Sequence, residues 1–155
     1  MAKPVFDNIL QIGVVVRDAR QTADQYKDLL GLDDWNVNHV DTRAGVGRDF
    51  HREGRPIEAK ARIVWMNIGN VELELIEPQD EDSVYAIFLR EKGPGIHHVM
   101  FSTPDYQSCA ERMARHQISV MAGGELQQTQ FQMFDTRETL GLICEIADGG
   151  ALVPD

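Results

Sequence analysis

The hydrophobic positions in the first half of the chain switch from strand-like to helix-like spacing and back. Residues 9–17 are rich in β-branched side chains, which indicates a strand. Apolar residues then recur at helical spacing between Asp18, a favourable N-cap, and Gly31, a favourable helix end. After a polar loop over 33–56, which has room for a short strand, the pattern predicts two strands joined by a Gly-Asn hairpin turn, residues 58–68 and 71–77.

The same order returns in the second half, after a short helix predicted over residues 80–92. Residues 96–102 indicate a strand, and Asp105 stands where the N-cap of a following helix is expected. Three short strands and a loose tail complete the pattern, with a turn at Gly123-Gly124 after the first strand: residues 118–121, 130–134 and 142–146, then 149–155.

Both halves therefore share the order strand, helix, several strands, which indicates an internal repeat. The predicted fold is α+β: a single domain over residues 1–155, built from two tandem βαβββ modules that form one cupped, mixed β-sheet around a metal site. The first module covers about residues 8–78 and the second about 95–148.

Four polar residues occupy equivalent positions in the two modules. Gln11 and His98 each lie seven residues before the N-cap aspartate of their module, and Glu74 and Glu145 each lie in its last strand. Because such repeats pack about a pseudo-twofold axis, we expect the four side chains to converge in one pocket. Their amide oxygen, imidazole and carboxylates suit a divalent cation such as Zn²⁺, Co²⁺, Ni²⁺ or Mn²⁺. Glu72 shares a strand face with Glu74, so the pattern alone leaves either as the ligand.

Composition excludes several classes of function. The chain has 155 residues, of which 43% are hydrophobic, without a long apolar run or a signal-peptide pattern, so we expect a cytoplasmic protein with no membrane partner. A formal net charge of −10 argues against nucleic-acid binding. The two cysteines, Cys109 and Cys144, are too few for a disulfide framework and are expected to be buried thiols.

Basic residues nevertheless concentrate in one stretch: Arg43, Arg48, Arg52, Arg55, Lys60 and Arg62. One interpretation is a solvated loop. The other is a rim, led by the first four arginines, that binds the phosphate or carboxylate groups of a substrate.

Four stretches resemble the vicinal-oxygen-chelate superfamily of glyoxalases, methylmalonyl-CoA epimerases, extradiol dioxygenases and bleomycin-resistance proteins: LQIGVVVRDARQTADQYKDLLGL, IGNVELELIEP, GPGIHHVMFSTPD and LGLICEIAD. The likeness is greatest to methylmalonyl-CoA epimerases. It implies that Glu74, His98 and Glu145 are metal ligands, with His98 preferred to the adjacent His97. Glu58, sixteen residues before Glu74, matches a proton-transferring glutamate of that family, which would make Glu58 and Glu145 the catalytic pair. An ordinary charged strand end is the alternative interpretation of Glu58.

Gln11 departs from the epimerase pattern, in which His usually stands at the first ligand position. Zinc-type glyoxalase I enzymes are similar to this chain there, whereas the two His and one Glu of extradiol dioxygenases are not matched. The resemblance thus implies a metal-dependent isomerase that moves an α-proton through a metal-stabilised enolate. The alternatives are a glyoxalase-type lyase acting on a thiol hemithioacetal and a non-catalytic binding or resistance protein; an intact ligand set and only 7% aromatic residues disfavour the latter. The implied partners are a small-molecule acyl-CoA or thiol adduct and a second copy in a homodimer.

Overall fold

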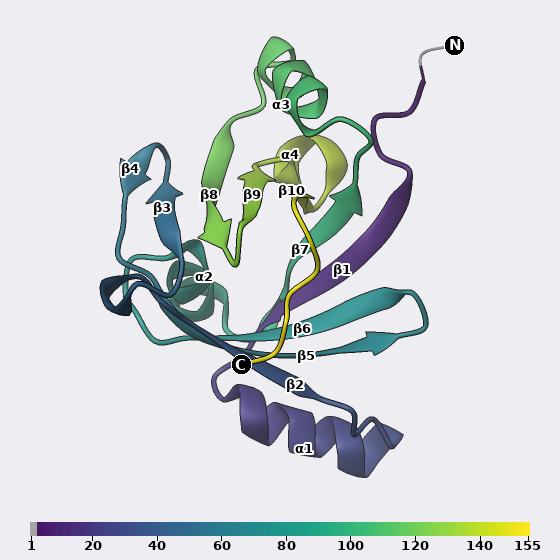
Figure 1. Cartoon of the computed structure of the whole chain (residues 1–155), viewed down its shortest axis with the longest axis vertical. Helices are drawn as coiled ribbons and strands as arrows, with labels where there is room; N and C mark the ends of the chain where they lie inside the picture. Colours follow the sequence, from purple (N-terminus) through teal and green to yellow (C-terminus); the bar gives the residue numbers. More distant parts are fainter. Residues whose placement is uncertain (1–2) are drawn as a thin grey trace.

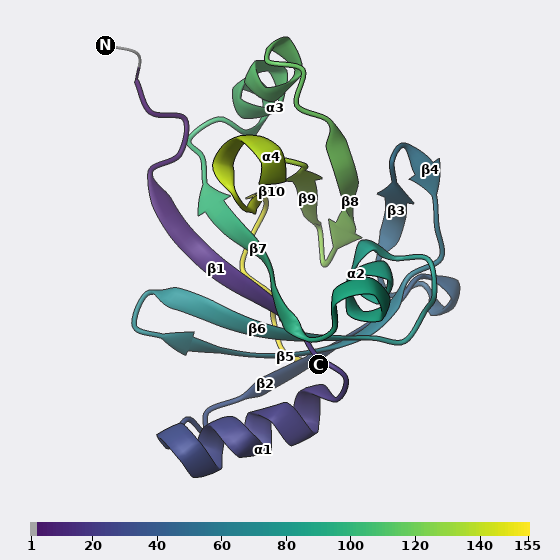
Figure 2. The same ribbon diagram turned by 180° about the vertical axis from the view of Figure 1, so that it is seen from behind.

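The computed structural model describes residues 3–155, in which ten strands form one mixed sheet in the order β2-β5-β6-β1-β7-β10-β9-β8-β3-β4. The first module contributes β1 (Asn8–Val15), β2 (Asn36–Asp41), β5 (Lys60–Ile68) and β6 (Val71–Pro78). The second contributes β7 (Gly95–Ser102), β8 (Val120–Leu126), β9 (Thr129–Phe134) and β10 (Ile143–Asp148). The sheet curls into a half-barrel (Figures 1 and 2), which confirms the predicted cupped α+β fold.

Helices follow the first strand of each module. They are α1 (Ala19–Leu30) and α3 (Tyr106–Arg115), which lie at opposite ends of the molecule in Figure 1. The predicted N-caps are confirmed, because Asp18 and Asp105 each accept a hydrogen bond from a backbone N–H three residues later. Two shorter helices are α2 (Val84–Lys92), between the modules, and α4 (Arg137–Leu140), which the sequence pattern did not predict. Within residues 3–155, no helix is long and apolar enough to cross a membrane.

The strand registers place the two modules in equivalent positions. At the centre of the sheet β1 and β7 run antiparallel, with Gln11 opposite Met100 and Gly13 opposite His98. Each module then pairs its first strand in parallel with its last, β1 with β6 and β7 with β10. Because strand side chains alternate between faces, matched registers direct equivalent residues into the same cup.

Apolar side chains cover both faces of the sheet. On the outer face of the first module α1 packs on a buried cluster: Val16, Ala19, Ala23, Val64 and Leu75. On the inner face a larger buried cluster lines the cup and draws on both modules: Val15, Val40, Phe50, Ala59, Ala61, Ile63, Trp65, Ile76 and Leu126. The buried, free thiols of Cys109 and Cys144 agree with the expected absence of a disulfide.

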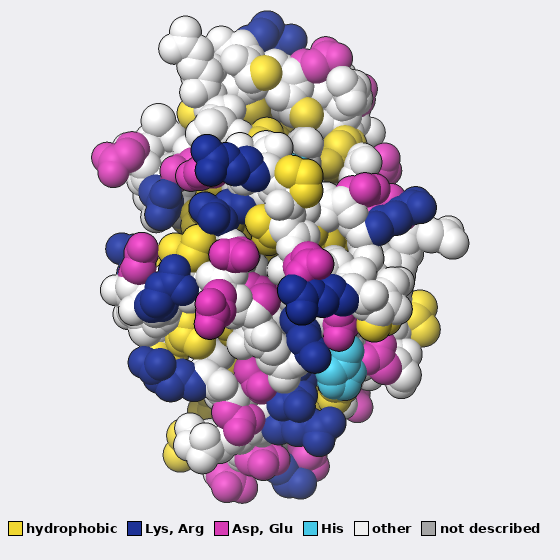
Figure 3. Space-filling view, turned by 90° about the vertical axis from the view of Figure 1, so that its left-hand side faces the viewer, with side chains coloured by type: hydrophobic (Ala, Val, Ile, Leu, Met, Phe, Trp, Pro, Cys, Tyr) yellow, Lys and Arg dark blue, Asp and Glu magenta, His cyan; other side chains and the backbone are white. Residues whose placement is uncertain are grey.

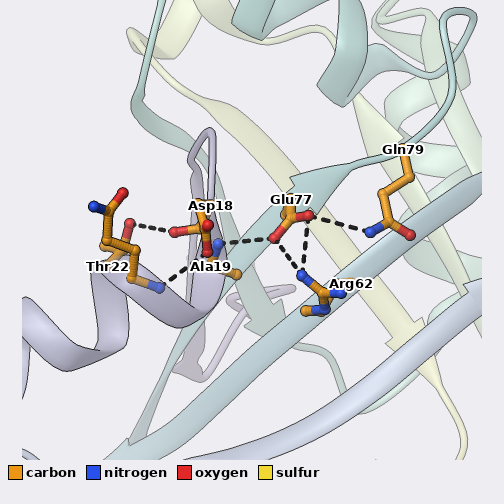
Figure 4. A network of polar contacts seen from close by, with 7 residues as sticks. Asp18, Ala19, Thr22, Arg62, Glu77 and Gln79 are labelled. Carbon is orange, nitrogen blue, oxygen red and sulfur yellow. Dashed lines mark hydrogen bonds and ion pairs between the residues drawn. The ribbon is translucent and has the colours of Figure 1, made fainter.

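A carboxylate fixes the start of α1 against the sheet (Figure 4). Glu77, near the end of β6, accepts a hydrogen bond from the Ala19 backbone N–H at 3.0 Å. Its two oxygens also accept from Arg62 of β5, at 3.0 and 3.2 Å, and Gln79 adds a further donor. An acidic group at a helix N-terminus is favourable, so this network sets where α1 leaves β1.

The segment 33–56, expected to be a loop with at most a short strand, holds more structure than predicted. After β2 it forms a short 3₁₀ helix (Thr42–Ala44) and then a hairpin of β3 (Arg48–Arg52) and β4 (Arg55–Pro56). β3 pairs with β8 of the other module. The segment therefore connects the two ends of the curled sheet, an arrangement that local sequence patterns do not encode.

The turn predicted at Gly123-Gly124 is wrong, because both glycines lie inside β8. A Cβ at position 124 would lie 2.7 Å from the Phe50 ring, and one at position 123 would lie 2.7 Å from His51 Nε2. The absence of a side chain at both positions thus allows β3 to pack against β8. The turn falls instead at Gln127 and Gln128, whose φ angles are 50° and 65°.

Candidate metal site

The four predicted ligands meet at the imidazole of His98. Its Nε2 lies 2.9 Å from Gln11 Oε1, 2.7 Å from Glu145 Oε2 and 3.7 Å from Glu74 Oε2. All four residues are buried, with His98 only 1% exposed. They come from the four central strands β6, β1, β7 and β10. We call Gln11, Glu74, His98 and Glu145 the quartet.

Gly13 makes room for the His98 ring. The two residues face each other across β1 and β7. A Cβ at position 13 would lie 2.7 Å from His98 Nδ1 and closer still to Cε1. An isolated glycine inside a strand pattern signals such a close approach, so the run QIGVVV held a clue to this position.

The quartet and Glu72 bring three carboxyl groups together away from water. Burial raises the pKa of Glu74 to about 8, and the neighbouring Glu145 and Glu72 add to the rise against the opposing effect of His98. Burial also raises the pKa of Glu72. Burial lowers the pKa of His98, but the carboxylates of Glu145, Glu74 and Glu72 outweigh it, so the net shift is upward. A divalent cation would offset this crowding of carboxylates.

The donor set fits such a cation. One imidazole nitrogen and three side-chain oxygens are ligands that Zn²⁺, Co²⁺, Ni²⁺ and Mn²⁺ accept. Glu145 Oε2 is buried, and its polar contact is His98 Nε2, 2.7 Å away. A buried carboxylate is costly unless it is paired with a positive charge or binds a cation. The quartet atoms contact one another directly, and no cluster of His, Cys, Asp or Glu in residues 3–155 is spaced as a preformed cation site.

Glu72 orients the Gln11 amide rather than joining the quartet. Gln11 Nε2 donates to Glu72 Oε1 at 2.6 Å, which leaves Gln11 Oε1 turned toward His98. The structure therefore separates the two glutamates that share a face of β6: Glu74 contacts His98, and Glu72 supports Gln11. The sequence pattern alone did not make this distinction.

His97, the residue before His98 in β7, supports the His98 ring. The two Nδ1 atoms are 3.1 Å apart, so one ring donates to the other. Burial lowers the pKa of His97 to about 3, which keeps it neutral near neutral pH and able to accept from His98 Nδ1–H. A partner on the second ring nitrogen is what a metal-ligating histidine needs, because it fixes the tautomer that leaves Nε2 free.

Glu58 is not brought to the quartet. Its side chain is 62% exposed, pairs with Arg43 and lines a separate polar cavity beside Asp80. The next residue, Ala59, is buried and lines the cavity that Gln11, Glu74 and Glu145 share. Ala59 and Asp80 line both cavities, so the two cavities adjoin, and Glu58 lines the polar one alone.

Three of the four arginines in the predicted rim contact other residues of the chain. Arg43 pairs with Glu58, Arg48 Nη2 lies 2.6 Å from a Glu125 oxygen, and Arg52 donates to the Asp82 carbonyl at 2.8 Å. Arg55 is exposed on β4, and none of the four lines the quartet's cavity. On the face in Figure 3, Lys and Arg side chains alternate with Asp and Glu. Binding of a substrate by these arginines stays a prediction.

The sequence matches the family model described as Glyoxalase/Bleomycin resistance protein/Dioxygenase superfamily over residues 10–133. It is 31% identical over 90 residues to the uncharacterized protein YqjC of Bacillus subtilis (strain 168), and the match spans 58% of this chain but only 53% of YqjC. It is 27% identical over 116 residues to the ethylmalonyl-CoA/methylmalonyl-CoA epimerase of Cereibacter sphaeroides, a match that covers 74% of each chain.

Solved structures share the fold. The methylmalonyl-CoA epimerase of Mycobacterium tuberculosis superposes with a TM-score of 0.68 at 18% identity, over 97% of this chain and 93% of that chain. A variant of the Streptomyces coelicolor methylmalonyl-CoA epimerase, in complex with 2-nitronate-propionyl-CoA, gives 0.67 at 21% identity, over 94% and 99%. The family model covers most of the chain, so this protein belongs to the glyoxalase/bleomycin resistance protein/dioxygenase superfamily.

Proposed function

We propose that this protein is a metal-dependent, epimerase-like isomerase that removes and returns the α-proton of an acyl thioester. The observation that carries the proposal is the convergence of Gln11, Glu74 and Glu145 on one buried nitrogen of His98, at the wall of a cavity. The name of the Cereibacter sphaeroides relative and the epimerases among the similar structures support the choice of reaction.

The quartet would hold a divalent cation through Gln11 Oε1, His98 Nε2 and the carboxylates of Glu74 and Glu145. A cation bound there supplies Lewis acidity, which stabilises the negative charge that develops on substrate oxygens as the α-proton leaves. Glu72 and His97 keep Gln11 and His98 turned toward the cavity. Glu145, which lines the cavity, is the base that we propose takes the proton.

An epimerisation needs a proton carrier on each face of the planar carbanion. The resemblance of the sequence pointed to Glu58 as the second carrier, but Glu58 lines a different cavity. Glu72 is not one of the four quartet residues, but its carboxylate lines the same cavity and accepts a hydrogen bond from Gln11. We therefore propose Glu72 as the second carrier, to be compared directly with Glu58 by substitution.

Deuterium exchange tests the proposal. The protein, stripped of metal and reloaded with Co²⁺ or Zn²⁺, is incubated with methylmalonyl-CoA in D₂O, and label at the α-carbon is followed by mass spectrometry. We expect exchange with metal and none without it, and Glu145→Gln should reduce its rate by a factor of about 10² or more. Equal exchange in the metal-free protein would contradict the proposal.

A glyoxalase-type lyase is the second candidate, favoured by one observation. The first ligand position holds Gln11, whose amide oxygen points at His98, where the epimerase pattern has His. The hemithioacetal of glutathione and methylglyoxal is the matching substrate. Formation of a thioester from it, without exchange of methylmalonyl-CoA, would select this function over the first.

A further inference from the structure

Beyond the quartet, the cavity widens into an apolar chamber. Its walls come from strands of both modules and from the C-terminal tail: Phe50, Ala61, Ile63, Leu126, Phe131 and Leu152. These residues also belong to, or pack against, one hydrophobic cluster. Gln11, Glu74 and Glu145 of the quartet line the same cavity, so one ligand can touch both them and the apolar walls.

The chamber is large for the small groups that surround a reacting carbon. The whole cavity measures about 350 Å³. An apolar cavity of about 150 Å³ is enough to hold benzene, so space remains beside the chelating part of a ligand. Ala59, just before β5, and Ala61, within it, leave space in the cavity because both are buried and their side chains are single methyl groups.

The tail closes the chamber and is fixed to both modules. Gln127 forms two hydrogen bonds of 2.8 Å with the backbone of Val153, one as donor and one as acceptor. Asn38 of β2 donates to the Val153 carbonyl at 2.7 Å, and Thr129 donates to the Gly150 carbonyl at 2.8 Å. The tail was expected to be loose, but these bonds hold it across the cup, as Figure 1 shows for the segment after β10.

Charge also restricts what enters the chamber. Among residues 3–155, no Lys or Arg lines the cavity, and its charged members are Glu72, Glu74, Asp80 and Glu145. Phosphates of a coenzyme A moiety would find no cationic partner inside and would stay outside the cavity. The chamber is therefore suited to an uncharged, apolar group.

Resting on the proposed function, we infer that the substrate carries an apolar group of about four to seven carbons, branched or aromatic, on or next to the reacting carbon. The chelating oxygens meet the quartet, and the apolar group fills the space between Ala61, Ile63 and Leu152. A methyl group would leave most of the chamber unfilled. The size of the group that fits between these three side chains then determines the class of substrate.

Binding of 2-methyl-, 2-butyl- and 2-benzylmalonyl-CoA to the Co²⁺-loaded protein tests this, measured by calorimetry. We expect the butyl or benzyl compound to bind at least about tenfold more tightly than the methyl compound. Ala61→Leu, which narrows the chamber, should abolish that preference. Ile63→Ala, which widens the chamber, should shift the preference toward the benzyl compound. This second variant still tests the inference if Ala61→Leu fails to fold. Ile68→Ala is the matched control, because Ile68 lies on the same strand, is 46% exposed and does not line the cavity.

Wild-type binding of all three compounds with equal affinity, or an equal effect of Ala61→Leu on each, would overturn the inference. Deuterium exchange of the same three compounds distinguishes failure of this inference from failure of the proposed isomerase function. Size-selective binding without exchange of any compound would uphold the chamber and reject the isomerase. Exchange with no dependence on the size of the side group would uphold the isomerase and reject the chamber.

Discussion

Gly13→Ala tests whether the close approach of β1 to the His98 ring holds the site together. The added methyl group would lie 2.7 Å from His98 Nδ1, nearer than non-bonded carbon and nitrogen atoms come. His98 is 1% exposed and contacts Gln11 and Glu145, so its ring has little space to move away. Either the ring tilts out of the quartet or the two central strands separate.

The expected cost follows from these two effects. Overpacking a buried site costs about 1–3 kcal/mol, and the crowding here favours the upper part of that range. Loss of a glycine stiffens the unfolded chain and returns about 0.4–1 kcal/mol. The net loss is therefore about 2 kcal/mol, which lowers the urea midpoint by roughly 1 M if the denaturant slope is about 2 kcal/mol per M.

Urea unfolding of the metal-free protein and Co²⁺ titration provide the two readouts. Gly95→Ala is the matched control, since Gly95 also lies in a central strand but a Cβ there would meet its nearest neighbour, Phe88, at an ordinary 3.9 Å. We expect Gly95→Ala to match or slightly exceed wild-type stability, and Gly13→Ala to lose about tenfold or more in Co²⁺ affinity. Equal stability and equal Co²⁺ affinity in the two variants would refute the reasoning.

Four further predictions follow from single contacts. Glu58→Gln should keep turnover within about twofold of wild type, whereas Glu72→Gln should reduce it by about 10² or more; the reverse order, measured by deuterium exchange, would restore Glu58 to the mechanism. Glu72→Ala should also weaken Co²⁺ binding by about 10- to 100-fold because Gln11 loses its acceptor, and unchanged affinity would show that Gln11 needs no support. The pKa of His97 is lowered to about 3 in the folded protein, so only the unfolded chain takes up this proton as pH falls below about 6.5; stability should drop by about 2 kcal/mol between pH 7 and 5 relative to His97→Gln, and parallel urea midpoints would contradict this. Gln127→Ala removes two of the three hydrogen bonds to the Val153 backbone, so proteolysis of the tail should accelerate severalfold, with exposed Gln128→Ala as control; equal cleavage rates would mean that Asn38 and other contacts suffice to hold the tail.

The elements that position the quartet could be predicted because their signals are local. Strand alternation places Glu74 and Glu145 on the inner face, and the Asp18 and Asp105 caps align the two modules. Once the repeat is recognised, convergence of the four side chains follows from symmetry. This is the part of the site that a single sequence specifies.

The remainder depends on contacts between segments that are distant in the sequence. Glu58 precedes the first residue of β5, so the alternation of side chains along that strand does not tell which way Glu58 points. The neighbouring residue, Ala59, lines the quartet's cavity instead. The sequence pattern predicts a turn at the two glycines of β8, because Phe50, the side chain that requires a glycine at position 124, comes from the other module. The tail is held by side chains such as Gln127 and Asn38, and by a backbone hydrogen bond from Asp155 N–H to the Val37 carbonyl, all between segments distant in the sequence.

The claim that the quartet is a metal site is tested most directly by cation stoichiometry. Metal-free wild-type protein and the His98→Ala variant would be titrated with Co²⁺ by calorimetry, with His116→Ala, an exposed histidine beyond α3, as control. We predict one high-affinity Co²⁺ per chain for the wild type and the control, and none for His98→Ala. A stoichiometry that is unchanged in His98→Ala would contradict the account, since any bound cation would then sit elsewhere.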